Sequence, residues 1–212
     1  DAKLQAITNG DNRAFSARVF RGILKELFGE RVNVEAPLPE QIAAAKHLAK
    51  QRLSEQLRRS WDHRNGSWDR EIRLDPDLPI FAYGGRLVPE KWGERAFSEA
   101  NIRKLVRGGA NVVIYGNVQA GEISANRFKE LVALAAALKA EGHRGQLVVR
   151  TGWDQDDQAL LLAAADVLVL DSSRHFDKRP SGTEAAGFTE VDGAANGCLV
   201  MGPSWLEGII QA

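Results

Sequence analysis

The sequence predicts an α/β protein: a Rossmann-like, doubly wound parallel sheet over residues 77–212, preceded by a helical N-terminal or linker segment over residues 1–76. From Leu78 onward, short apolar runs alternate with helical stretches, and this alternation favours parallel strands joined by right-handed crossovers. The runs are apolar throughout, as expected of strands that are covered on both faces. We therefore predict strands at 80–83, 111–115, 146–149, 167–170 and 198–201, with helices at about 94–107, 122–141, 156–165 and 186–196.

The N-terminal segment contains two predicted helices. In the first, apolar residues recur at helical spacing between Phe15 and Leu27, and Gly29 is a typical helix stop. Two prolines then interrupt the chain. The second helix, at about 39–60, has one apolar face. Its basic residues stand largely elsewhere and are expected on a solvated face: Lys46, Lys50, Arg52, Arg58 and Arg59.

Charge and cysteine content argue against several classes of function. The chain has 28 basic and 28 acidic side chains and a net charge of zero, which argues against nucleic acid or an anionic membrane as the main partner. The single cysteine, Cys198, cannot form an internal disulfide, and in its apolar run it is expected to be a buried small hydrophobic side chain rather than a nucleophile. No apolar run reaches the roughly 20 residues that a membrane helix requires. No pair of His or Cys residues has metal-ligand spacing, so no metal site is predicted.

The ends of the chain suggest a piece of a longer protein. The chain begins at Asp1 without a methionine or a signal-like leader, and it stops in an apolar run without a helix-stop signal. The missing leader and the solitary cysteine lead us to expect a cytoplasmic protein, of which this chain is one excised domain.

The loop after the first predicted strand is a candidate phosphate site, because ligands of a doubly wound sheet bind at the carboxyl ends of its strands. Gly84 and Gly85 would let a ligand approach the backbone closely. Arg86 and Lys91 follow, five residues apart. Arg can hold two phosphate oxygens in a fork, and Lys supplies a point charge. The alternative is that the two cations are merely exposed on a loop.

A second candidate lies nearer the C-terminus, where Ser181, Gly182 and Thr183 precede the helix predicted at 186–196. Backbone N–H groups at a helix N-terminus carry partial positive charge and lack intrahelical partners. This junction therefore suits a phosphate group. An ordinary connection between a strand and a helix is the alternative.

Several short motifs carry a family resemblance. Residues 184–190, E-A-A-G-F-T-E, resemble the E-x-x-G-[LFY]-T-[QPE] element of retaining glycosyltransferases of the GT-B architecture, notably glycogen and starch synthases. Residues 181–185, S-G-T-E-A, are similar to a run in α-glucan phosphorylases, which share that fold. Arg86 and Lys91 resemble the G-R-x-x-x-x-K element of the synthases, and residues 152–156, G-W-D-Q-D, resemble their G-Y-D-E-E loop.

The resemblance implies roles for the matched residues. Arg86 and Lys91 would bind the donor phosphates, and Glu184 would orient the donor sugar by accepting hydrogen bonds from its hydroxyls. Asp192, eight positions after Glu184, would support the site. In the phosphorylases its position holds the lysine that carries pyridoxal phosphate, so no cofactor is expected here. The other residues expected to line the donor site are Gly84, Gly85, Gly116, Trp153, Gly187, Phe188 and Thr189.

The expected function is a retaining hexosyltransferase domain that binds an activated α-glucosyl donor, a nucleotide sugar, for transfer to a glucan or another acceptor. As one half of a GT-B fold, the chain would rely on the missing N-terminal GT-B domain for the acceptor and would turn over little or not at all alone. Two alternatives remain. One is an α-glucan phosphorylase-like domain that binds a sugar phosphate, and the other is a non-catalytic sugar- or nucleotide-binding module.

Overall fold

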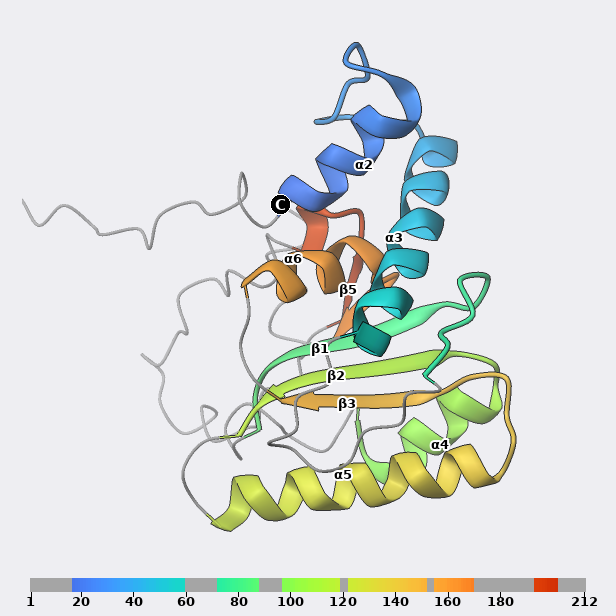
Figure 1. Cartoon of the computed structure of the whole chain (residues 1–212), viewed down its shortest axis with the longest axis vertical. Coiled ribbons are helices and arrows are strands. Elements are labelled where there is room, and N and C mark those ends of the chain that lie inside the picture. The colour runs from blue at the N-terminus through green and yellow to red at the C-terminus, as the bar shows by residue number, and fades with distance from the viewer. Residues whose placement is uncertain are drawn as a thin grey trace, which may run out of the picture.

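The chain forms one parallel sheet of five strands. The computed structural model describes the following residues of the chain: 17–59, 72–87, 97–118, 122–151, 155–169 and 193–201. The strands are β1 (Ile80–Arg86), β2 (Asn111–Asn117), β3 (Leu147–Thr151), β4 (Val167–Val169) and β5 (Leu199–Met201). They lie in the order β3-β2-β1-β4-β5, and every neighbouring pair is parallel (Figure 1). The predicted α/β class and parallel sheet are confirmed, and the strand order is the Rossmann-like one.

Helices cover both faces of this sheet (Figure 1). One face packs against α4 (Glu99–Arg107) and α5 (Glu122–Ala140), which connect β1 to β2 and β2 to β3. The opposite face packs against α2 (Arg18–Phe28), α3 (Pro39–Arg59) and α6 (Gln155–Ala164). These helices agree with the predicted ones to within a few residues. Of the helix predicted at 186–196, the structure describes residues 193–196, and 193–195 are helical.

Alternation along each strand produces two hydrophobic cores. On β2, Val113 faces α3 and α6, whereas its neighbours Val112 and Ile114 face α4 and α5. All three are buried. Successive strand residues point to opposite faces, so a run that is apolar throughout requires cover on both sides. This requirement explains why the sequence reads as continuous apolar segments.

The helices of the N-terminal segment share a core with the sheet. Phe20 and Leu24 of α2 and Ala49 of α3 are buried in the same cluster as Ala82 of β1 and Leu168 of β4. Apolar area of this kind contributes about 25 cal/mol per Å² removed from water, so these helices stabilise the face of the sheet that they cover. Local signals set their ends, since the C-terminal cap of α2 is Gly29 with φ of 82°.

The direction of the chain across the sheet reverses between β1 and β4. The first connections run outward from β1 to β2 and β3, and the next crosses back to β4. β1 pairs with β2 along all seven of its residues and, within the described ranges, with β4 through Phe81 and Ala82. In open sheets of this kind, ligands bind beyond the carboxyl ends of the strands at such a reversal. The end of β1 is therefore the place to look for a site.

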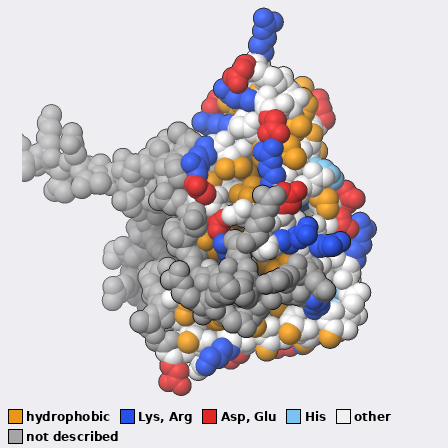
Figure 2. Space-filling view, in the orientation of Figure 1, with side chains coloured by type: hydrophobic (Ala, Val, Ile, Leu, Met, Phe, Trp, Pro, Cys, Tyr) orange, Lys and Arg blue, Asp and Glu red, His pale blue; other side chains and the backbone are white. Residues whose placement is uncertain are grey.

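Charges of both signs are intermingled on the surface. In Figure 2, Lys and Arg side chains lie among Asp and Glu side chains over α2 and α3. Several of these charged side chains form ion pairs with one another. Nζ of Lys25, for example, lies 2.7 Å from Oε2 of Glu30. Among the described residues, no helix has an apolar stretch long enough to cross a membrane.

One surface network has a marked effect on an acid. Glu141, directly after α5, lies 2.7 Å from Nη1 of Arg103 and 2.9 Å from both Nη2 of Arg107 and Nε2 of His143. Hydrogen bonds from His143 and then Arg107 lower the pKa of Glu141 to about 2. The network ties the end of α5 to α4.

Candidate functional site

The carboxyl end of β1 carries three of the predicted site residues. Gly84, Gly85 and Arg86 lie within β1 and pair in register with the last three residues of β2. The prediction that this strand ends at residue 83 and is followed by a loop is therefore wrong by three residues. Glycine has weak strand propensity, but the ladder with β2 holds the backbone extended regardless of propensity. The three residues thus reach the edge of the sheet on a regular strand.

The glycines at this edge have different local surroundings. Among the described residues, an ideal Cβ at Gly84 would have no heavy atom within 4 Å, whereas one at Gly85 would lie 3.0 Å from Oη of Tyr83. At Gly116 a Cβ would come within 2.6 Å of Cγ of Leu87, so Gly116 is explained by packing. Gly116 also lies inside β2, which extends two residues beyond the strand predicted at 111–115. Of these three glycines, Gly84 therefore has space beside it for a ligand within the described part of the chain.

A buried polar cluster stands at the same edge. Asp157, in the first turn of α6, forms an ion pair with Arg150 of β3, with 2.6 Å between Oδ2 and Nη2. Tyr115 of β2 donates its hydroxyl to Oδ2 at 3.5 Å, and Gln56 of α3 donates to Oδ1 at 2.9 Å. The guanidinium carbon of Arg150 lies 5.5 Å from the ring centroid of Tyr115. We call these four residues the Asp157 cluster.

The sequence reasoning missed this cluster. None of its four residues is among the predicted site residues. Asp156 and Asp157 do lie in the first turn of α6, where the helix dipole favours acids. Asp156 forms an ion pair with Arg18, however, as Asp157 does with Arg150. The sequence contained one signal for the cluster: Arg150 follows directly on a buried apolar run. An unpaired charge is costly at such a position, so a partner for Arg150 could have been expected.

The remaining predicted site residues lie outside the described part of the chain. Only the backbone of Arg86 is described. The proposed roles of the others stay predictions, and these residues are Lys91, Trp153, Glu184, Gly187, Phe188, Thr189 and Asp192.

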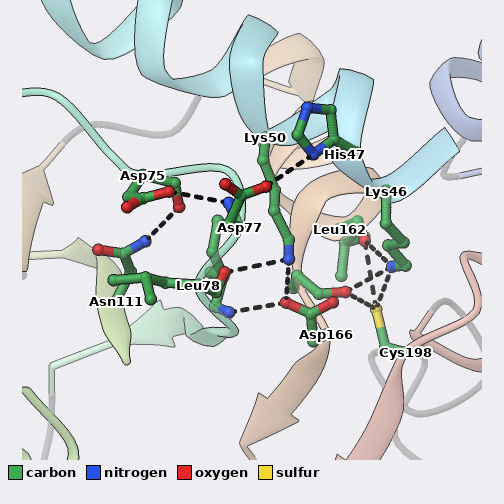
Figure 3. Close-up of polar contacts among 12 residues, drawn as sticks. Lys46, His47, Lys50, Asp75, Asp77, Leu78, Asn111, Leu162, Asp166 and Cys198 are labelled. Carbon is green, nitrogen blue, oxygen red and sulfur yellow. Dashed lines mark hydrogen bonds and ion pairs between the residues drawn. The ribbon is translucent and has the colours of Figure 1, made fainter. Parts of the chain in front are cut away.

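A second polar cluster lies at the opposite, amino edge of the sheet (Figure 3). The prediction that all basic residues of α3 are solvated is wrong for Lys46 and Lys50, which are both buried. Lys46 donates to the carbonyl of Leu162 at 3.3 Å and to that of Ala165. These carbonyls belong to the last turn of α6 and the residue after it, where carbonyls lack intrahelical partners and a cation is favourable.

Cys198 contacts the same two carbonyls. Its thiol donates to Leu162 and Ala165 at 3.2 Å each, and Nζ of Lys46 lies 3.4 Å from its sulfur (Figure 3). Burial lowers the pKa of Lys46 and raises the pKa of the Cys198 thiol. A raised pKa agrees with the expectation that Cys198 is not a nucleophile, but the thiol is half-buried and hydrogen-bonded rather than a purely apolar contact.

Lys50 completes this cluster. Its ammonium lies 2.8 Å from Oδ2 of Asp166 and donates to the carbonyl of Leu78 at 3.1 Å. The same carboxylate oxygen accepts the backbone N–H of Ile80 at 2.7 Å. Lys50 thereby joins α3 to the beginnings of β1 and β4. Since this edge carries the amino ends of the strands, we assign the cluster a structural role.

Among the described residues, no group of three or more His, Cys, Asp or Glu side chains could hold a metal ion. No protein-family model matches the chain, and no curated protein matches it.

Proposed function

We propose that the chain is the donor-binding domain of a retaining glycosyltransferase of the GT-B type, which binds an α-glucosyl nucleotide sugar for transfer to a glucan or another acceptor. The observation that carries the proposal is the course of β1. This strand brings Gly84, Gly85 and the backbone of Arg86 to the carboxyl edge beside the reversal of the sheet. The R-x4-K motif of the family resemblance begins at Arg86, which is the last residue of β1. Of the matched motifs, this one starts on a described strand end.

The chemistry of sugar transfer suits cations at this edge. When the anomeric carbon separates from a diphosphate, negative charge grows on the leaving group in the transition state. A preorganised donor aimed at such charge is worth about 2.7–4 kcal/mol. We assign that role to Arg86 and Lys91, and Glu184 would orient the sugar ring through its hydroxyls.

Calorimetric titration of the chain with ADP-glucose, UDP-glucose, glucose 1-phosphate and pyridoxal phosphate tests the proposal. The test variant is Arg86→Ala with Lys91→Ala. The matched control is Arg73→Ala with Lys104→Ala, which removes two exposed cations outside the carboxyl edge. We expect one nucleotide sugar to bind to the wild type and to the control, and the test variant to lose that binding.

Other outcomes contradict the proposal in distinct ways. Binding of pyridoxal phosphate with glucose 1-phosphate would favour the phosphorylase-like alternative, although Asp192 occupies the lysine position. Equal binding of the nucleotide sugar by test and control variants would show that Arg86 and Lys91 do not hold its phosphates. Nucleotide-sugar binding by an intact full-length protein that transfers no sugar would favour the non-catalytic module.

A further inference from the structure

Three residues stand in one row across neighbouring strands at the carboxyl edge. Gly84 pairs with Tyr115, and Tyr115 pairs with Arg150. Adjacent strands lie about 4.8 Å apart, which separates the backbones of Gly84 and Arg150 by about 10 Å. Residues in one row point to the same face of the sheet, and Tyr115 packs in the core beneath α3 and α6. The space beside Gly84 and the Arg150 side chain therefore lie on the same face.

The guanidinium of Arg150 is held before any ligand binds. Its ion pair with Asp157, the ring of Tyr115 and the bond from Gln56 to Asp157 come from separate elements of the fold. The side chains of Arg150 and Asp157 are only 16% and 10% exposed. A guanidinium group that is already immobilised loses little conformational entropy when it binds a ligand.

Part of the donor capacity of Arg150 is unused. A guanidinium has five N–H donors, and the ion pair involves Nη2. Within the described part of the chain, neither Nε nor Nη1 of Arg150 has a hydrogen-bond partner. Because neither nitrogen is a fully buried atom without a partner, both are accessible at this edge of the sheet. A ligand that supplies acceptor oxygens at this edge would satisfy them.

The charge of the cluster limits the kind of ligand group. Asp157 places a carboxylate 2.6 Å from the guanidinium, so the positive charge is compensated locally. A second anion here would gain little from Arg150 and would be repelled by Asp157. A hydroxyl or carbonyl oxygen can accept from the remaining N–H groups without that penalty.

We propose that Arg150, held by Asp157, is a specificity-determining residue that binds a neutral oxygen of the donor and disfavours an additional anionic group at that position. The proposal rests on the proposed function, since it concerns the same ligand. It divides the carboxyl edge into two parts: the end of β1, which binds phosphate, and the end of β3, which binds an uncharged polar group.

The test compares Arg150→Lys, which retains the charge opposite Asp157 but lacks the fork, with Arg103→Lys as the matched control at a surface ion pair. Kd values are measured calorimetrically for the nucleotide sugar that the wild type binds and for inorganic pyrophosphate. We expect Arg150→Lys to weaken binding of the nucleotide sugar about tenfold or more, because the ligand oxygen loses its hydrogen-bond donor. Pyrophosphate binding should stay within about twofold of wild type, and the control should bind both ligands as the wild type does.

Asp157→Asn provides the second arm, since the amide keeps the shape of the carboxylate and removes its charge. We expect this variant to bind pyrophosphate more tightly than the wild type does, because the positive charge of Arg150 is then uncompensated. The 2′-deoxy form of the nucleotide, and glucose 1-phosphate without a nucleoside, show which oxygen Arg150 binds. The analogue that lacks this oxygen should be insensitive to Arg150→Lys.

The failures of the two proposals are distinguishable. If the wild type binds no nucleotide sugar, the proposed function fails and this inference falls with it. If the wild type binds the nucleotide sugar and Arg150→Lys binds it equally well, only the role of Arg150 is refuted. Equal weakening of nucleotide sugar and pyrophosphate by Arg150→Lys, with unchanged unfolding in urea, would also refute it, because the residue would then act on the phosphates.

Discussion

Asp166→Ala should destabilise the fold substantially, because it breaks the buried ion pair with Lys50. The two charged atoms lie 2.8 Å apart, and the side chains are 9% exposed for Lys50 and 32% exposed for Asp166. Oδ2 of Asp166 also accepts the N–H of Ile80. After the substitution, the contact of the Lys50 ammonium that remains in Figure 3 is the carbonyl of Leu78.

The size of the effect follows from this burial. Removing one partner of a buried ion pair costs about 3–5 kcal/mol. Water reaches Asp166, so the pair is partly screened, and we expect a loss of about 2–3 kcal/mol. Lys50→Met should cost about 1–2 kcal/mol, because the carboxylate that it leaves behind can hydrate. The double variant buries no unpaired charge and should lose about 1.5 kcal/mol less than the sum of the single losses.

Urea unfolding at neutral pH measures these losses of stability in the wild type, the two single variants and the double variant, provided that all four share one m value. The control cycle uses the surface pair Lys25 and Glu30, whose side chains are 44% and 81% exposed. Its coupling energy should lie below about 1 kcal/mol. If the losses from Lys50→Met and Asp166→Ala simply add, or couple no more than the control pair does, the carboxylate does not compensate the buried ammonium and the reasoning is wrong.

Three further predictions concern other parts of the structure. Gly145→Ala should lower the free energy of unfolding by about 1–3 kcal/mol, because its Cβ would overlap the carbonyl oxygen of Ala110 and lie 2.7 Å from that of Val106. The control is Gly22→Ala in the interior of α2, where the new Cβ would have no described atom within 4 Å outside the backbone of its own helix; it should raise the free energy of unfolding by about 0.5–1 kcal/mol. Glu141 has a folded pKa of about 2, below its ordinary value of 4.5, so its contribution to stability is present above pH 4.5 and is lost as the pH falls toward 2. In Glu141→Gln, the free energy of unfolding should therefore depend less on pH between 4.5 and 2. The raised pKa of Cys198 predicts alkylation by iodoacetamide at pH 7.5 that is at least about tenfold slower in the folded chain than in urea.

Each of these predictions has a clear contrary result. Equal stability of the Gly145 and Gly22 variants would mean that the backbone near Gly145 moves aside without cost. A Glu141→Gln variant that loses stability with acid as steeply as the wild type would place the acid sensitivity elsewhere. Equal alkylation of folded and unfolded chains would show that the Cys198 thiol is neither shielded from solvent nor held by the carbonyls of Leu162 and Ala165.

The order and type of the described elements could be predicted from the amino-acid sequence. Each of the five predicted strands is observed, because a run of apolar residues that cannot alternate must be covered on both faces. The helices from α2 to α6 were also predictable, since apolar spacing and signals such as Gly29 act within a few residues of each other. The alternation of the elements then restricted the topology to a parallel sheet.

Tertiary structure alone decided which polar residues work together. Lys46 meets Ala165 across 119 positions of sequence, and Gln56 meets Asp157 across 101. No local pattern reveals such contacts, and on its own helix Lys46 reads as one more solvated cation. The extension of β1 through Gly84, likewise, depends on its ladder with β2 rather than on its own propensity. Hydrophobic periodicity is a local property of the chain, whereas the partner that makes a buried charge tolerable is supplied by elements that only folding brings near it.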